Sequence, residues 1–214
     1  MAKPPLMGRA KSRLAAEVGP ARAAGFNRAS TARLLTLLAG DPRWTLRLCV
    51  NARAGERYAC WPEGVLRLAQ GGGDLGMRMA RAARAVSPGP MVILGTDTPQ
   101  LQRRDVANAF AALGGADVVF GPAADGGYWL VGLARRRPLP GLFAGVRWST
   151  RHALADTLAG LPPGTLTHHL RQLTDVDDAA ALRTLHARWG APRMGPWARP
   201  SASDDRAARA RDPR

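Results

Sequence analysis

Apolar and polar positions in this chain form short continuous apolar runs and longer stretches with the spacing of amphipathic helices. The run Met91–Leu94 is apolar at every position, which is typical of a central strand in a parallel sheet. Strand-like runs occupy 45–50, 65–69, 91–95, 117–121 and 127–132, and helical spacing occupies 20–39, 75–85, 104–113, 150–158 and 178–189. Because the two kinds of segment alternate, the pattern predicts an α/β fold with a largely parallel sheet.

This pattern predicts a single domain over residues 1–190, a size that suits one hydrophobic core. It stops near Ala191, after which four Pro and many Arg and Ala follow without apolar periodicity. We expect residues 191–214 to form a disordered basic tail.

The composition narrows the classes of partner. No window approaches the roughly 20 apolar residues of a membrane span, and two cysteines, Cys49 and Cys60, are too few for a disulfide scaffold, so a cytoplasmic protein without a membrane partner is expected. The net charge of +15 comes mainly from Arg scattered over the whole chain. This scatter argues against nucleic acid as the partner, although it is compatible with phosphorylated small molecules.

A first candidate site is the turn Gly95-Thr96-Asp97-Thr98-Pro99, which directly follows the most buried strand. Ligands of open α/β sheets bind at the carboxyl ends of the strands. There Asp97 would bridge a divalent metal to phosphates, since Mg²⁺ and Mn²⁺ prefer carboxylate oxygens. The alternative is that Asp97 only caps the next helix.

A second turn carries Asp125, Gly126 and Gly127 and is followed by Tyr128 and Trp129. Tandem glycines permit close approach of the backbone to a ligand, and an aromatic ring can pack on a sugar or base. The same Asp-Gly-Gly sequence is also typical of a simple hairpin turn between two strands.

A third acidic segment, Leu173-Thr174-Asp175-Val176-Asp177-Asp178, precedes the last expected helix. Alternation along a strand would place Asp175 and Asp177 on the same side, where either completes a metal site with Asp97. Capping of the helix is the competing interpretation.

Two further segments have the character of phosphate loops. Residues 3–14 offer Gly8 for backbone access and Arg9, Lys11 and Arg13 as cations, although the spacing is not that of a Walker A loop. Residues 70–79 form a glycine-rich loop that opens a helix, whose N-terminus favours anions, or alternatively a flexible connector.

Together these segments resemble the DUF2064 family, also called the radical-SAM/selenodomain-associated transferase 1 family. The resemblance spans residue 2 to about 189 and is carried by six motifs in one order. They are Ala2-Lys3-Pro4 with Gly8-Arg9-Ala10-Lys11-Ser12-Arg13-Leu14, Gly73-Asp74-Leu75-Gly76 with Arg78-Met79, Gly95-Thr96-Asp97-Thr98-Pro99, Gly121-Pro122-Ala123 with Asp125-Gly126-Gly127-Tyr128-Trp129-Leu130, Val146 with Trp148-Ser149-Thr150, and Leu173 with Asp175-Val176-Asp177.

The resemblance implies a GT-A-like, Rossmann-like domain with helices on both faces of its sheet. It implies Mg²⁺ or Mn²⁺ on Asp97 and Asp177, with Asp175 as the alternative ligand, and a catalytic role for Asp125. The implied nucleotide and phosphate contacts are Lys3, Gly8, Arg9, Lys11, Arg13, Gln70, Gly73, Asp74 and Gly76. The implied acceptor or sugar contacts are Gly126, Gly127, Tyr128, Trp148, Ser149 and Thr150.

The implied activity is glycosyl transfer from a nucleotide-diphosphate sugar to a small acceptor. Two alternatives remain: nucleotidyl transfer from a nucleoside triphosphate to a phosphorylated small molecule, and a degenerate protein that binds nucleotides without catalysis. Metal neutralisation of a leaving diphosphate would serve either reaction.

The chain departs from the family pattern in two places. The family has Asp-Thr-Pro where this chain has Asp177-Asp178-Ala179, and family members carry an apolar first strand before the Ala-Lys-Pro motif, where this chain has only Met1. We therefore expect a gap beside the strand at 91–95. Six to eight added upstream residues are predicted to fill it and raise stability.

Overall fold

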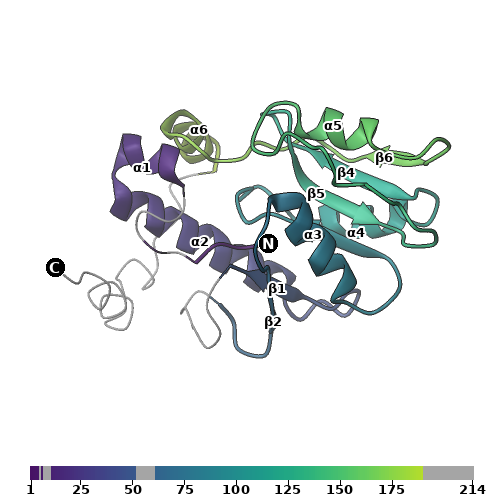
Figure 1. Ribbon diagram of the computed structural model, residues 1–214. Coiled ribbons are helices and arrows are strands. Elements are labelled where there is room, and N and C mark those ends of the chain that lie inside the picture. Colours follow the sequence, from purple (N-terminus) through teal and green to yellow (C-terminus); the bar gives the residue numbers. More distant parts are fainter. Residues whose placement is uncertain (5, 7–10, 52–60, 190–214) are drawn as a thin grey trace.

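The computed structural model describes residues 1–4, 6, 11–51 and 61–189 as an α/β domain (Figure 1). Its helices are α1 (Ser12–Val18), α2 (Pro20–Leu38), α3 (Leu75–Arg84), α4 (Arg103–Ala112), α5 (Ala153–Ala159) and α6 (Ala179–Trp189). Its strands are β1 (Arg47–Val50), β2 (Leu66–Ala69), β3 (Met91–Leu94), β4 (Val118–Pro122), β5 (Tyr128–Leu133) and β6 (Thr167–His169). The predicted tail at 191–214 and the residues Gly8, Arg9 and Cys60 lie outside the described residues.

The strands form two sheets, and the larger one is mixed, so the prediction of a largely parallel sheet is wrong. The larger sheet has the order β3-β5-β4-β6, with β5 antiparallel to both β3 and β4 and β6 parallel to β4. The reason is the short turn between β4 and β5, which leaves no room for the helical crossover that a parallel pair needs. The smaller sheet pairs β1 with β2 in parallel.

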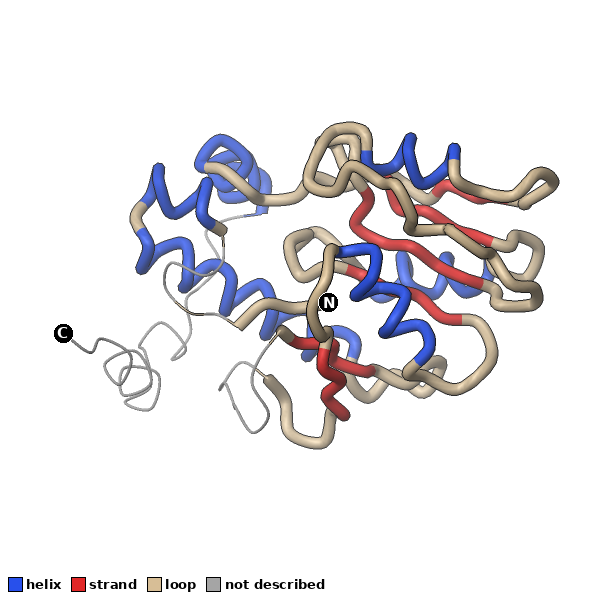
Figure 2. The backbone as a smooth tube through the Cα atoms, in the orientation of Figure 1, coloured by secondary structure: helices blue, strands red, loops and turns tan. Residues whose placement is uncertain are grey.

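Helices cover both faces of the larger sheet, as expected. Val119 and Leu130 contribute to the core on the face covered by α2 and α4, with Leu34 and Val106 among the packed residues. Ile93, Phe120 and Val131 point to the opposite face, where Met79 of α3 joins the cluster. Figure 2 shows helices on the near and far sides of the strands.

Three helices form a separate cluster beside the sheet. Leu14 of α1, Phe26 of α2 and Leu185 of α6 pack around Val176, which is fully buried. Because α1 begins at Ser12, the segment expected to be a phosphate loop over 3–14 ends in the first turn of a helix. Because α1 packs against α6, the first and the last of the six sequence motifs lie close together (Figure 1).

The first two residues lie between the sheets, beside the place where a gap was expected. Ala2 pairs in parallel with Val50 of β1, and the amino group of Met1 donates to the carbonyl oxygen of Leu94 of β3 at 2.7 Å. The amide of Gln70 also fastens this segment, because it donates to the carbonyl oxygens of Ala2 and Cys49.

Among the described helices, none combines the length and the apolar character needed to cross a membrane.

Candidate functional site

A cavity of about 720 Å³ opens where the segments after β3 and before β5 meet the start of α1. Its volume falls in the range of small-molecule sites. Many of the sequence-predicted site residues line it: Lys3, Lys11, Arg13, Gln70, Asp74, Asp97, Asp125, Gly127, Tyr128, Trp148, Ser149, Thr150, Asp175 and Asp177. Three others, Gly73, Gly76 and Gly126, are placed outside its lining.

Three segments that are distant in sequence meet at one side of the cavity, here called the polar wall, where Lys11 pairs with both Asp97 and Asp177. The ammonium of Lys11 lies 2.8 Å from Oδ1 of Asp97 and donates to Oδ1 of Asp177 at 2.7 Å. Lys11 is the N-cap of α1 and has a left-handed backbone, with φ 56° and ψ 48°. This conformation is unfavourable for a residue with a side chain, so contacts elsewhere have to offset its cost.

The Lys11 side chain is only 4% exposed, whereas the carboxylates of Asp97 and Asp177 are 45% and 47% exposed. Burial disfavours the charge on Lys11, but the nearby Asp97 and Asp177 outweigh it and raise its pKa. The cavity wall therefore carries two half-exposed carboxylates, both paired with the buried ammonium of Lys11.

Asp175 lines the same cavity and is bound to the segment after β3. Its Oδ1 accepts a hydrogen bond of 2.6 Å from Oγ1 of Thr98. Burial, together with the charges of Asp97 and Asp125, raises the pKa of Asp175 to about 6, and the Thr98 hydrogen bond opposes this rise.

Asp175 and Asp177 reach the cavity by a different route from the predicted strand alternation. Residues 174–177 form no strand, and the backbone N–H of Val176 donates to the carbonyl oxygen of Asp97 at 3.1 Å. Helix capping falls to the next residue, since Asp178 accepts from the N–H of Ala181 at 2.7 Å. Capping therefore does not account for Asp175 or Asp177.

The Asp125 turn closes the hairpin between β4 and β5 and contributes to the lining of the cavity. Asp125 is exposed, and its Oδ1 accepts from the N–H of Gly127 at 2.9 Å. Gly126 has a φ of +86°, and a side chain there would collide with the backbone of Arg151. The glycine is thus required by packing of the turn against the 150–154 segment.

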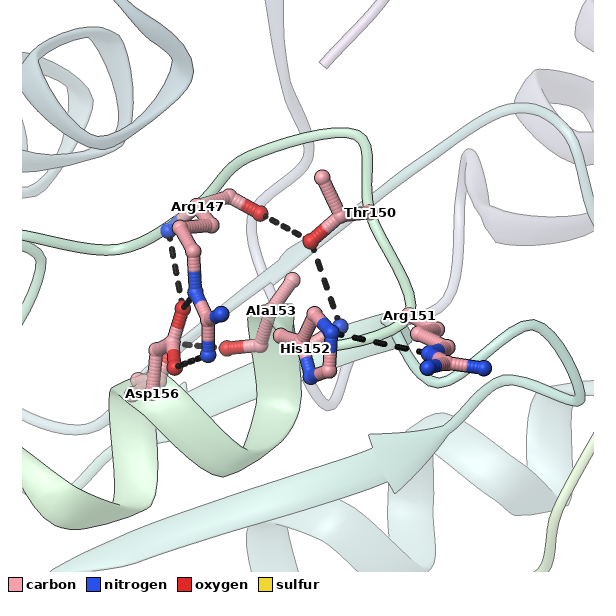
Figure 3. A network of polar contacts seen from close by, with 7 residues as sticks. Arg147, Thr150, Arg151, His152, Ala153 and Asp156 are labelled. Atoms are coloured by element: carbon pink, nitrogen blue, oxygen red, sulfur yellow. Dashed lines mark hydrogen bonds and ion pairs between the residues drawn. The ribbon is translucent and has the colours of Figure 1, made fainter.

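Residues 147–156 carry three of the predicted acceptor contacts, Trp148, Ser149 and Thr150, and are held by a polar network (Figure 3). Arg147 pairs with Asp156 of α5 through its guanidinium and its backbone N–H. Thr150 donates to the carbonyl oxygen of Arg147 and accepts from the N–H of His152, so residues 150–152 form a turn and α5 begins only at Ala153. The network fixes the loop that presents Trp148 and Ser149.

The aromatic wall of the cavity continues into the core. The rings of Tyr128 and Trp148 lie 6.3 Å apart at an angle of 77°, and Tyr128 also meets Phe120 edge to face at 5.4 Å. Burial raises the pKa of Tyr128 to about 12. This wall suits the faces of a sugar or base.

The glycine-rich loop before α3 has its polar groups used internally. Asp74 caps the helix by accepting from the N–H of Met77 at 2.8 Å, and Arg81 donates to the carbonyl oxygens of Gln70 and Gly72. Gly76 is needed for packing, because a Cβ there would lie 2.6 Å from the carbonyl oxygen of Phe143. Because the Asp74 carboxylate already caps the N-terminus of α3, an anion bound there would lie beside a negative charge.

Sequence reasoning missed Asn27, which lies on α2 and lines the cavity. Asn27 is 3% exposed, and its Nδ2 is buried without a hydrogen-bond partner among the described residues. Buried amides are normally paired, so a ligand atom is a natural acceptor. The available signal was a polar stripe at helical spacing, formed by Asn27, Ser30 and Thr31 on the buried side of α2.

The donor set fits a divalent metal with few protein ligands. Oδ1 of Asp97 and Oδ1 of Asp177 both touch one cation, the Lys11 ammonium, so both can approach a single ion. No group of three or more His, Cys, Asp or Glu placed to hold a metal occurs within the described ranges. Mg²⁺ commonly takes one or two carboxylates and completes its shell with phosphates and water.

Comparison with known proteins adds a family and a related structure. The model of the family described as "Uncharacterized protein conserved in bacteria (DUF2064)" matches residues 34–150, more than half of the chain. The chain is also similar to the crystal structure of a "putative nucleotide-diphospho-sugar transferase" from Desulfovibrio desulfuricans G20. That match has a TM-score of 0.77 and 26% identity and covers 98% of this chain and 93% of the other. The curated proteins contain no match to this chain.

Proposed function

This chain belongs to the DUF2064 family, and we propose that it is a metal-dependent transferase that uses a nucleotide-activated donor. The donor that the site suits best is a nucleotide-diphosphate sugar, and the acceptor is a small molecule. The similarity to a protein described as a nucleotide-diphospho-sugar transferase supports this class of substrate.

The observation that carries the proposal is the pair Asp97 and Asp177, whose oxygens converge on one cation inside a cavity of about 720 Å³. Two half-exposed carboxylates at one point match the way proteins hold Mg²⁺ or Mn²⁺ beside phosphates. A structural ion pair would not need a cavity of this size next to it.

Each wall of the cavity has a part in the proposed reaction. Asp97 and Asp177 hold the metal, which when bound supplies positive charge to the leaving diphosphate. Lys11 and Arg13 add cationic groups near the same phosphates. Tyr128 and Trp148 would position the sugar, and the exposed carboxylate of Asp125, which lines the cavity, would accept the proton of an acceptor hydroxyl.

Nucleotidyl transfer is the second candidate, because the same carboxylates and cations would serve a triphosphate. The two reactions differ in the ligand that the cavity prefers. Binding therefore separates them before any product is identified.

The experiment is a thermal-shift titration with Mn²⁺ or Mg²⁺ and a panel of nucleoside triphosphates, diphosphates and nucleotide sugars. A ligand at 100 times its Kd adds about 2.7 kcal/mol to the free energy of unfolding. Metal-dependent stabilisation by a nucleotide sugar supports glycosyl transfer, and preference for a triphosphate transfers the proposal to nucleotidyl transfer. No shift with any ligand would overturn both.

Asp97→Asn is the site variant for this titration, and Asp117→Asn is its matched control. Asp117 precedes β4 at the end away from the cavity and pairs with the exposed Arg137 at 2.8 Å. The control removes one carboxylate from an ion pair without touching the cavity. Only Asp97→Asn is expected to abolish the metal-dependent shift.

A further inference from the structure

The position between Asp97 and Asp177 has one occupant in the structure, the Lys11 ammonium. We infer that Lys11 and a divalent cation are alternative occupants of this position, so that Lys11 must withdraw before the metal can bind. The inference rests on the proposed function, because it assigns the metal to these two carboxylates.

The contacts make the two occupants mutually exclusive. The Lys11 nitrogen uses Oδ1 of both carboxylates, at 2.8 and 2.7 Å, and these are the oxygens that converge. A magnesium ion needs carboxylate oxygens at about 2.0–2.1 Å. An ammonium left in place would be a second cation in direct contact with the metal, and like charges at that distance repel strongly.

The Lys11 side chain is also able to move away from the two carboxylates. Its four-carbon stem is flexible, and the residue stands before the first turn of α1. Within the part of the chain that the structure describes, the partners of its ammonium are Asp97 and Asp177. The left-handed backbone of Lys11 is a cost that these two contacts offset, so replacing them with a metal releases the side chain.

A consequence is that metal and polyphosphate assist each other. Metal binding alone must displace a buried ammonium and leave it without a partner, whereas a polyphosphate beside the metal supplies that partner. By linkage, each ligand then raises the affinity for the other by the same factor. Lys11 serves as a positioning residue that joins the two binding events.

The first test compares Mn²⁺ affinity by electron paramagnetic resonance in the unsubstituted chain, Lys11→Met and Lys11→Arg. Methionine has similar length and no charge, and arginine keeps the charge. Without nucleotide, Lys11→Met is expected to bind Mn²⁺ at least tenfold more tightly than the unsubstituted chain, and Lys11→Arg is not. Equal or weaker binding by Lys11→Met overturns the exchange while leaving the metal site standing.

The second test watches Lys11 itself. Lysine occurs only at Lys3 and Lys11, so ¹⁵N-lysine labelling gives two ammonium signals, and Lys3→Arg assigns them. Mg²⁺ at saturation is expected to shift or broaden the Lys11 signal while that of Lys3 stays, and Asp97→Asn should remove the effect. An unchanged Lys11 signal with Mg²⁺ bound contradicts the inference; absence of binding of either metal to every variant overturns the metal part of the proposed function instead.

Discussion

The two walls of the cavity are built by different physical means. The aromatic wall, with Tyr128 and Trp148, continues the hydrophobic cluster on one face of the larger sheet and is fixed by packing. The polar wall joins Lys11, Asp97 and Asp177, which are far apart in sequence and meet through charge. A wall held by packing is preformed, whereas a wall held by ion pairs changes with the ions present. The site thus combines a fixed surface for shape with an adaptable one for chemistry.

The sharpest way to break the polar wall is Asp97→Asn. Losing one carboxylate from a paired charge cluster typically costs about 2–5 kcal/mol of interaction, which corresponds to a metal affinity roughly 30-fold lower or more. We expect metal-dependent turnover to fall in step. Mn²⁺ titration and product formation measure the effect, and unchanged values in Asp97→Asn would refute the assignment.

The aromatic wall is tested by Gly76→Ala. A Cβ at this position would lie 2.6 Å from the carbonyl oxygen of Phe143 and 2.8 Å from the Trp148 ring. We expect overpacking to lower the free energy of unfolding by about 1–3 kcal/mol. Gly72→Ala, in the loop that precedes α3, is the matched control, since a Cβ there meets no atom within 4 Å. Urea unfolding of both variants should show a loss only at Gly76.

Alkaline pH offers a second probe of the aromatic wall. The pKa of Tyr128 is raised to about 12 from an ordinary value near 10. A raised pKa means that this contribution to stability is present below pH 10 and is lost as the pH rises through 12. Between pH 10 and 12 we expect the free energy of unfolding to fall by about 2–3 kcal/mol less in Tyr128→Phe than in the unsubstituted chain. Thermal unfolding between pH 9 and 12 measures the difference, and identical slopes in both proteins would contradict it.

Asn27→Leu tests whether the buried Asn27 amide, which lines the cavity, serves ligand binding or the stability of the fold. Replacing a buried amide whose Nδ2 has no partner among the described residues is expected to leave stability unchanged or raise it by about 1 kcal/mol. If the amide serves a ligand, the same change reduces the thermal shift caused by nucleotide. Melting temperatures with and without nucleotide provide the measurement, and an undiminished ligand shift would exclude Asn27 from binding.

Much of the fold could be predicted from local pattern. The apolar run at Met91–Leu94 and the helix at Pro20–Leu38 appear where the sequence places them, within one residue at most. The direction of β5 differs from the predicted parallel order, although the Asp125-Gly126-Gly127 sequence is itself typical of a hairpin turn. Turn length, which is local, outweighs the apolar character of the strands in deciding direction.

The candidate site was harder to predict because its arrangement depends on long-range contacts. The sequence predicts Asp97 and Asp177 as metal ligands and Lys11 as a phosphate contact, but nothing in their spacing indicates that the lysine lies between the carboxylates. Asn27 was missed because a polar residue in a helix is most often on the exposed side. Only the packing of α2 against the sheet shows that this residue is buried beside the cavity.

The hydrogen bond from Val176 to the carbonyl oxygen of Asp97 has a mechanical consequence for the site. The Val176 side chain packs in the cluster of α1, α2 and α6, so this packing and the main-chain bond together link the three helices to the segment after β3. The backbone at Asp97 is thereby tied to the segment that carries Asp177, while the ion pairs with Lys11 join the two carboxylates themselves. A shift of the three helices relative to the larger sheet would therefore reach the metal-binding carboxylates through the backbone, without any change in the cavity's own side chains.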